Sequence, residues 1–264
     1  MTINTDVSIP EFIVKEFSPK KSKYCLCIPI INEIGRIDIQ LKKMKTLGID
    51  LLIDIIICDG GSTDGSTNPT MLKNFGVNTL LIKNDTGKQG AQLRIGFWWG
   101  LQRGYEGFVT IDGNNKDSVE SIPLFIEQLD SGFDFIQGSR FIKGGSAINT
   151  PLLRYISILL IHAPIISITA RHRFTDTTNA FRAYSKKYLS HEAVQPFRSI
   201  FQTYELLAYL STRASQIRLK VTEVPVSRIY PKGEKTPTKI SPFRGNLNIL
   251  SILIKNAFGV FLPR

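Results

Sequence analysis

The sequence predicts one α/β domain with a mostly parallel central sheet and flanking helices. Short apolar runs typical of buried strands alternate with segments whose apolar residues recur at helical spacing, and this alternation favours parallel strands. The length of 264 residues suits a single large domain, since sheet-based domains often reach about 250 residues. Apolar residues make up 42% of the chain, which is enough to build a sizeable core.

The individual elements follow from the same patterns. Four short apolar runs are expected to form strands, at residues 24–31, 49–58, 79–82 and 107–111. Two segments have helical periodicity, residues 32–48 and 90–104, and Gly48 suits the end of the first. We expect a polar N-terminal arm over residues 1–22, the main domain over 23–240 and an apolar C-terminal helix over 241–264.

The charge of the chain indicates an anionic partner. Lys and Arg number 33 against 22 acidic residues, which gives a formal charge of +11. Such an excess suits a phosphorylated ligand, an anionic membrane or nucleic acid. No block of basic residues interleaved with aromatics is present, so nucleic acid is not expected as a partner.

The cysteines and the N-terminus indicate the cytoplasm. Cys25, Cys27 and Cys58 are odd in number and lie in apolar runs, so we expect buried, reduced thiols rather than disulfides or a zinc site. The N-terminus has no basic segment followed by an apolar one, and no signal peptide is therefore predicted.

Polar loops follow the second and fourth predicted strands. Asp112 ends the fourth strand, and Gly113 and Asn114 follow it; these oxygens could hold Mg²⁺ or Mn²⁺ together with a substrate phosphate, or form an ordinary turn. Asp59 ends the second strand, where it could bind a base or ribose or form an Asx turn. Because ligands bind at the carboxyl ends of parallel strands, both loops are expected at one site.

A third candidate lies at the start of the helix predicted over residues 90–104. Lys88 and Arg94 flank Gly90, and a glycine turn that opens a helix beside cations suits a diphosphate. A solvated helix start is the alternative.

In this order, the segments resemble glycosyltransferase family 2, and within it the branch of the dolichol-phosphate mannose synthases. Pro29-Ile-Ile-Asn-Glu33 resembles the first-strand motif Pro-x-x-Asn-Glu. Asp59-Gly-Gly-Ser-Thr-Asp64 is similar to the loop Asp-Asp-Gly-Ser-x-Asp, and Gly90-Ala-Gln-Leu-Arg94-Ile-Gly96 to the helix start Gly-Ala-x-x-Arg-x-Gly.

Later segments extend the resemblance to about residue 240. Asp112 to Pro123 falls where the family has its metal-binding Asp-x-Asp. The further similar segments are Gly138-Ser-Arg140-Phe141, residues 175–184, Glu223-Val-Pro225 and Lys239-Ile240.

The resemblance implies a GT-A fold and a role for each site residue. Pro29, Glu33 and Asp59 would hold the nucleoside of a nucleoside-diphosphate sugar, with Lys88 and Arg94 near its diphosphate. Asp112, Gly113 and Asn114 would hold the diphosphate through Mg²⁺ or Mn²⁺. Near the acceptor, Asp176 would act as base or orienting group, and Arg140, Arg182 and Lys239 would hold a phosphate, Arg182 close to the reacting atoms.

The implied reaction is an inverting transfer of a sugar to a polyprenyl phosphate at the cytoplasmic face of a membrane. A growing surface glycan is the alternative acceptor. Two departures from the family pattern, Asn114 and Gly60 in place of aspartates, leave a third hypothesis, a catalytically inactive protein that binds sugar nucleotides. The sequence does not decide the oligomeric state, and a homo-oligomer is one of the options.

Two apolar stretches predict contact with an anionic membrane surface. Residues 151–170 and 246–262 are almost wholly apolar, and basic residues flank both. Interfacial helices with basic flanks bind anionic leaflets in this way. For the first stretch, a buried core helix is the alternative; its uncharged run, residues 155–170, is shorter than the about 20 residues that spanning helices need.

Overall fold

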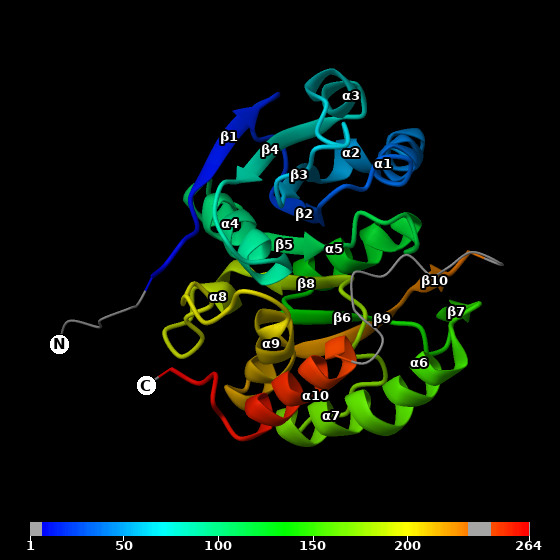
Figure 1. Cartoon of the computed structure of the whole chain (residues 1–264), viewed down its shortest axis with the longest axis vertical. Coiled ribbons are helices and arrows are strands. Elements are labelled where there is room, and N and C mark those ends of the chain that lie inside the picture. Colours follow the sequence, from blue (N-terminus) through cyan, green and yellow to red (C-terminus); the bar gives the residue numbers. More distant parts are fainter. Residues whose placement is uncertain (1–6, 232–243, 264) are drawn as a thin grey trace.

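A computed structural model of the chain describes residues 7–231 and 244–263 and shows an eight-stranded sheet with helices on both faces (Figure 1). The strand order is β1-β4-β3-β2-β5-β8-β6-β9. Strands β4, β3, β2 and β5 run parallel, as do β6 and β9, while β1 and β8 run antiparallel to their neighbours. The predicted α/β class and the mostly parallel sheet are therefore confirmed.

The strands of the main sheet are β1 (Phe12–Glu16), β2 (Tyr24–Ile30), β3 (Asp54–Asp59), β4 (Val77–Lys83), β5 (Gly107–Thr110), β6 (Phe135–Ser139), β8 (Arg182–Ser185) and β9 (Val221–Pro225). A separate parallel pair is formed by β7 (Ser146–Ile148) and β10 (Ser227–Ile229). Strand β10 also lies beside the loop after β5, because Arg228 of β10 forms a bridge with Asp117 of that loop.

The helices are α1 (Ile37–Thr46), α2 (Ile49–Leu52), α3 (Pro69–Asn74), α4 (Gln89–Gln102), α5 (Ile122–Asp130), α6 (Leu152–Ser157), α7 (Ala163–Ala170), α8 (Lys186–Leu189), α9 (Glu205–Gln216) and α10 (Arg244–Ala257). A 3-10 turn η1 (Val119–Ser121) precedes α5, and a π-helical turn η2 (Ile158–His162) joins α6 to α7. Pro164 lies in the first turn of α7. Because proline has no N–H to donate to the preceding turn, the wider π turn is a physically reasonable way to continue the helix.

The sheet has a hydrophobic core on each face. Successive side chains of a strand point to opposite faces, so Cys25 and Cys27 of β2 pack with α4 and α9, while Leu26 and Ile28 pack with α1 and α5. The cysteines are buried and form no disulfide, as predicted. A Cβ atom at Gly96 of α4 would lie 2.6 Å from the Cys58 sulfur, so this glycine lets the helix approach the sheet.

Two predicted boundaries are wrong. The strand expected over residues 49–58 begins only at Asp54, because residues 49–52 form the helical turn α2. The carboxylate of Asp54 is buried and accepts hydrogen bonds from the N–H groups of Lys21 and Ser22 and from the Tyr105 hydroxyl. The second boundary is that of the N-terminal arm, expected over residues 1–22. Residues 12–16 of this range form β1, which is an edge strand of the main sheet.

The apolar stretch before residue 171 is one helical segment from Leu152 to Ala170, through α6, η2 and α7. By length and composition it could cross a membrane, and 17% of its most apolar window is buried in the protein. Its buried residues include Ile158, Ala163 and Ile166, and α7 packs against α9 and α10. One side of this helical segment thus packs against the rest of the protein. Helix α10 packs beside it, against α7 and α9.

Candidate active site

The loops after β2 and β3 are joined by hydrogen bonds at the carboxyl end of the sheet. The N–H of Asn32 donates to the Ser62 hydroxyl (2.9 Å), and the N–H of Thr63 donates to the Asn32 side-chain oxygen (2.8 Å). The N–H of Ile34 donates to Asp64 (2.9 Å). These hydrogen bonds join the loops that follow the first and second predicted strands.

Asp59 stabilises its own loop. Its carboxylate accepts hydrogen bonds from the N–H groups of Gly61 (2.9 Å) and Ser62 (3.0 Å) and from the Ser62 hydroxyl (2.5 Å). The side chain is buried, so the Asx-turn alternative describes the geometry. Asp59 shapes the loop at which a nucleoside is expected.

Two further candidates for the nucleoside lie in and after β2. Pro29 is half-buried and lies opposite Cys58 of β3. Glu33 forms an ion pair with Arg36 (3.1 Å), and its carbonyl accepts the first hydrogen bond of α1 from Ile37. Both residues belong to the edge of the sheet on which Asp59 also lies.

Asp112 meets the start of α4. The Gln89 side-chain N–H donates to Asp112 Oδ1 (3.1 Å), which brings Lys88 to this region as well. Lys88 is exposed, and no ion pair of its amine is found within residues 7–231 and 244–263. A Cβ atom at Gly113 would lie 2.4 Å from Ile30, so the glycine allows the Asp112 loop to pack against β2.

Arg94 does not lie at the predicted diphosphate position. It is buried in α4, and Nη1 donates to the carbonyls of Ser8 (2.6 Å) and Arg198 (2.9 Å). Five residues along a helix correspond to a rotation of roughly 140° from Gln89, so the side chain leaves α4 on another face. Arg94 fixes the N-terminal segment to the body of the protein.

The sequence analysis missed Arg228, which follows the Glu223-Val-Pro225 motif by three residues. Its guanidinium donates from Nη2 to Asp112 Oδ2 (3.1 Å) and from Nη1 to Asp117 Oδ2. Burial disfavours the charge on Arg228, but the carboxylates of Asp117 and Asp112 outweigh burial and raise its pKa. Burial raises the pKa of Asp117, an effect that Arg228 partly offsets.

Three cations surround the ring of Tyr230, and Lys116, Arg154 and Arg228 with this ring are called the Tyr230 cluster below. Lys116 Nζ lies 5.4 Å from the ring centroid, and Cζ of Arg154 and of Arg228 each lie 5.7 Å from it. Burial alone would raise the pKa of Tyr230, yet the positive charges of Arg228 and Arg154 lower it. Burial lowers the pKa of Lys116, and the charge of Arg228 lowers it further. The cluster is thus a region of strong positive potential beside Asp112.

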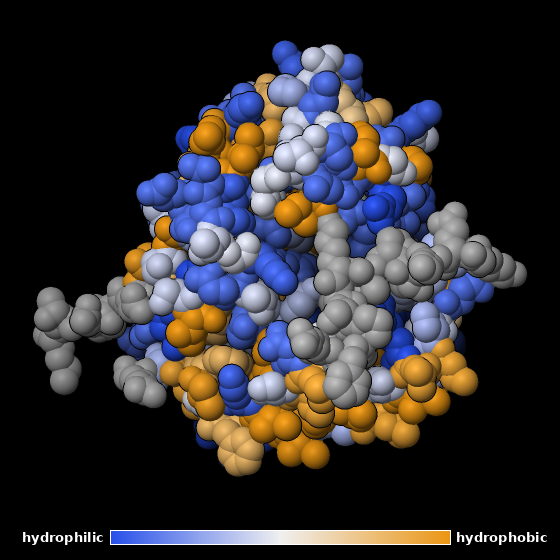
Figure 2. Space-filling view, viewed as in Figure 1, coloured by the Kyte–Doolittle hydropathy of each residue, from blue (hydrophilic) through white to orange (hydrophobic). Residues whose placement is uncertain are grey.

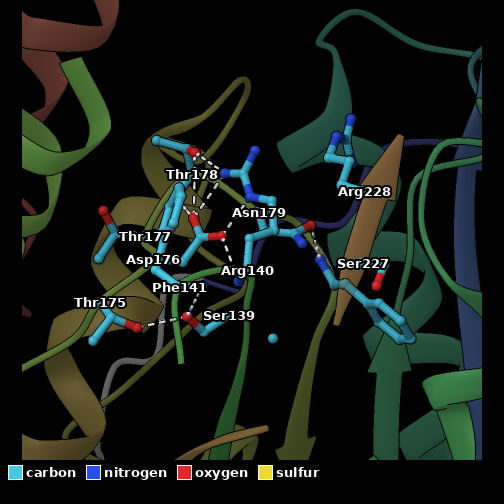
Figure 3. Close-up of polar contacts among 12 residues, drawn as sticks. Ser139, Arg140, Phe141, Thr175, Asp176, Thr177, Thr178, Asn179, Ser227 and Arg228 are labelled. Atoms are coloured by element: carbon cyan, nitrogen blue, oxygen red, sulfur yellow. Dashed lines mark hydrogen bonds and ion pairs between the residues drawn. The ribbon is translucent and has the colours of Figure 1, made fainter. Parts of the chain in front are cut away.

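Asp176 is bound to Arg140 (Figure 3). The Arg140 guanidinium donates from Nε to Asp176 Oδ2 (2.6 Å) and from Nη2 to Asp176 Oδ1 (2.9 Å). The Asp176 side chain has no exposed surface. Because both oxygens of this carboxylate are taken up by charge-assisted hydrogen bonds from one arginine, the predicted role as base is not supported, and the predicted orienting role fits.

Of the other two cations expected near an acceptor phosphate, Arg182 is structural and Lys239 lies outside the described residues. The Arg182 guanidinium donates to the carbonyls of Thr177 (2.9 Å), Asn179 (2.9 Å) and Leu207 (2.8 Å). All of these partners are main-chain carbonyls, two in the loop that follows Asp176 and one in α9. Arg182 therefore holds that loop against α9 and does not reach the reacting atoms.

The residues around Asp112 form a poor site for a resident divalent metal. Both oxygens of Asp112 accept hydrogen bonds from nitrogen donors, and Asp117, the other aspartate of this loop, is buried. The amide of Asn114 offers one neutral oxygen, which has no hydrogen-bond partner. Within the ranges that the structure covers, no group of three or more His, Cys, Asp and Glu could hold a metal. The metal prediction is therefore not supported by these contacts.

Sequence comparison finds relatives whose names include a polyprenyl or dolichyl group. No protein-family model matches the chain. An undecaprenyl-phosphate mannosyltransferase of Micrococcus luteus is 26% identical over 203 residues, which covers 76% of this chain and 81% of that protein. A polyprenol monophosphomannose synthase of Mycolicibacterium smegmatis is 27% identical and covers 66% of each chain. A dolichol-phosphate mannosyltransferase of Pyrococcus furiosus is 25% identical over 66% of this chain and 49% of that protein. The chain thus spans less than two thirds of the length of the Mycolicibacterium smegmatis and Pyrococcus furiosus proteins.

Solved structures show the same fold. Glucosyl-3-phosphoglycerate synthase from Mycobacterium tuberculosis, in complex with Mn²⁺, UDP and phosphoglyceric acid, matches with a TM-score of 0.64 at 15% identity, over 91% of this chain and 79% of that one. The same enzyme with Mg²⁺ and UDP matches with a TM-score of 0.60 at 13% identity, over 89% and 78% of the two chains. The chain is therefore similar in sequence to polyprenyl-phosphate mannosyltransferases and has the GT-A glycosyltransferase fold.

Proposed function

We propose that the protein transfers a sugar from a nucleoside-diphosphate sugar to a polyprenyl phosphate, with inversion at the anomeric carbon. The relatives carry polyprenyl or dolichol phosphate in their names, and the related structure binds UDP. The donor would lie along the carboxyl edge of the sheet, with its nucleoside at the loops after β2 and β3 and its diphosphate beside Asp112, Lys88 and the Tyr230 cluster.

One observation favours a phosphate acceptor over a hydroxyl acceptor. The three carboxylates nearest the expected reacting atoms, Asp112, Asp117 and Asp176, are each paired with an arginine. A hydroxyl must lose a proton when it attacks, which requires a base. A fourth carboxylate, Glu223, lies next to Asp176 and accepts hydrogen bonds from the N–H groups of Thr175 and Asp176. A phosphate monoester is already anionic, so a cation-rich site whose carboxylates are engaged in this way suits it.

The chemistry is then a displacement at the anomeric carbon. A phosphate oxygen of the acceptor forms a bond to that carbon, and the bond from the carbon to the donor's β-phosphate oxygen breaks. The electron pair leaves on the nucleoside diphosphate, so negative charge increases there. Preorganised cations stabilise such charge, and Arg154 and Arg228 lie where they can bind both the acceptor phosphate and the leaving group.

The acceptor lipid also requires a membrane, and we propose that the face formed by α6, η2, α7 and α10 lies on it. Figure 2 shows apolar residues gathered along one end of the molecule, where Figure 1 places these helices. Leu153 (81% exposed), Leu160 (72%), Ile168 (77%) and Phe258 (82%) are on this surface. Arg171, Arg173 and Lys255 are exposed beside them, which suits an anionic leaflet and a peripheral position on the cytoplasmic face.

A transfer assay tests the proposal. Full-length protein would be incubated with radiolabelled UDP-, GDP- or dTDP-sugars and anionic vesicles that contain undecaprenyl phosphate. Matched vesicles would contain undecaprenol, which has the same chain and no phosphate. We expect label in the lipid fraction with the phosphate only. Transfer to undecaprenol, or to a soluble glycan in place of either lipid, would contradict the phosphate acceptor.

The Asp59 loop makes a separate prediction. Asp59→Ala should lower the affinity for the free nucleoside diphosphate, because the loop loses the acceptor of its hydrogen bonds; a charge-assisted bond contributes about 1.5–3 kcal/mol. Asp59→Asn keeps one acceptor oxygen and should lose less. Isothermal titration of both variants measures this, and unchanged affinity in Asp59→Ala would remove the loop from the nucleoside site.

A further inference from the structure

The most unusual feature of the candidate site is a pair of buried cations beside Asp112, the residue for which the sequence predicts a metal. Arg228 is ion-paired with Asp112 and Asp117. Lys116 lies four residues after Asp112 in the same loop and is also buried. Both belong to the Tyr230 cluster, so the loop that would hold a metal is covered by positive charge from within the chain.

The charge balance of these residues disfavours a further cation. Among the described residues around Asp112, three cationic side chains, Lys116, Arg154 and Arg228, accompany two carboxylates, Asp112 and Asp117, and both carboxylates pair with Arg228. A divalent ion at Asp112 would have to displace Arg228 and then stay close to it. Like charges at such separations repel strongly where water is excluded. An anion, in contrast, is attracted to the excess of positive charge.

We propose that Lys116 and Arg228 replace the divalent metal, binding the donor diphosphate and stabilising it as it leaves. This rests on the proposed function, because it concerns the same donor. Asp112 and Asp117 each accept a hydrogen bond from one Nη group of Arg228, which holds the planar guanidinium in one orientation beside the loop. Lys116 adds a second charge on the Asp112 loop. A bound diphosphate would favour the charged form of Lys116.

The departure from the family pattern at Asn114 then has an explanation. Asn114 in place of an aspartate removes a carboxylate from the loop, and its amide N–H donates to Asp112 Oδ2 (3.3 Å). A second carboxylate would add a metal ligand but would also bind Lys116 or Arg228 and withdraw it from the diphosphate. The neutral side chain therefore suits a site in which the cations come from the protein.

The test is nucleotide binding with and without metal. UDP, GDP, ADP and dTDP would each be titrated calorimetrically into the wild-type chain in EDTA and again in Mn²⁺. We expect the nucleotide that binds to do so in EDTA, with an affinity within about threefold of that in Mn²⁺, because charge-assisted bonds from the chain already hold the phosphates. Binding that requires Mn²⁺ overturns the inference and leaves the proposed function standing. Binding of none of the four under either condition overturns both.

Variants identify the cations. Lys116→Met should lower the affinity in EDTA by about tenfold or more, since it deletes one charge-assisted bond. Lys43→Met removes an exposed lysine that pairs with Glu120 and should leave the affinity unchanged. Asn114→Asp combined with Lys116→Met should regain affinity when Mn²⁺ is added, because the loop then has two carboxylates and one cation fewer. Equal affinity of Lys116→Met and wild type in EDTA would exclude Lys116, and the wild-type comparison stands even if a variant fails to fold.

Discussion

Asp176→Ala is expected to lower the free energy of unfolding by about 3–5 kcal/mol, because it leaves the buried Arg140 guanidinium without its counterion. The pair is buried on both sides, with 2% of the Arg140 side chain and none of the Asp176 side chain exposed. Burial disfavours the charge of Arg140, and the hydrogen bonds and charge of Asp176 outweigh burial and raise its pKa. The charge would therefore remain after the substitution, in an environment that no longer compensates it. Urea denaturation at neutral pH measures the loss.

Two comparisons make this result specific. Glu120→Ala breaks an exposed ion pair with Lys43 (2.7 Å) and should change stability by less than about 1 kcal/mol. Replacing both partners, as Arg140→Met with Asp176→Leu, should recover much of the lost stability, since no unpaired charge remains buried. If Asp176→Ala were as stable as wild type and lost only activity, Asp176 would be a base and the orienting role assigned above would be wrong.

The second large effect is expected at the membrane. Leu153→Glu combined with Leu160→Glu should reduce binding to anionic vesicles by roughly a hundredfold or more, because each leucine contributes about 1.5–3 kcal/mol when fully buried in an apolar phase. The two side chains project from the single helical segment that includes α6, η2 and α7. Vesicle cosedimentation at low salt measures the effect. High salt should weaken, without abolishing, the binding of the wild type, since only the contribution of the basic residues is screened.

Leu51→Glu is the matched control. Leu51 is 80% exposed and lies in α2, at the end of the molecule opposite to α7 (Figure 1). It should bind vesicles as the wild type does. Nucleotide affinity should be unchanged in the double variant, because the donor loops follow strands of the sheet rather than the apolar helices. A double variant that still binds vesicles as the wild type does would show that this face is not the membrane surface, and a soluble acceptor would become the better hypothesis.

The sequence by itself determined the fold class and the place of the site. Alternating apolar runs and helical periodicities required a parallel sheet, and the polar loops after the second and fourth predicted strands had to meet at its carboxyl edge. The contacts of Asn32 with Ser62 and Thr63 join the loops after the first and second predicted strands, and the contact of Gln89 with Asp112 joins the loop after the fourth predicted strand to the start of α4. Local sequence also identified Asp59 as an Asx-turn candidate, since an Asx turn depends on the next few residues only.

Only the tertiary structure decided which charged side chains face the site. Arg94 and Arg182 match family motifs, yet their guanidinium groups are committed to main-chain carbonyls of segments far away in sequence. Arg228 is 116 positions from Asp112 in the sequence and is brought to it by the pairing of β10 with β7 and the bridge to Asp117. No local pattern encodes such a contact. The side chain of an arginine is long and flexible, so it can donate either to main-chain carbonyls or to a carboxylate of the site. The packing of the whole chain decides which of these partners it meets.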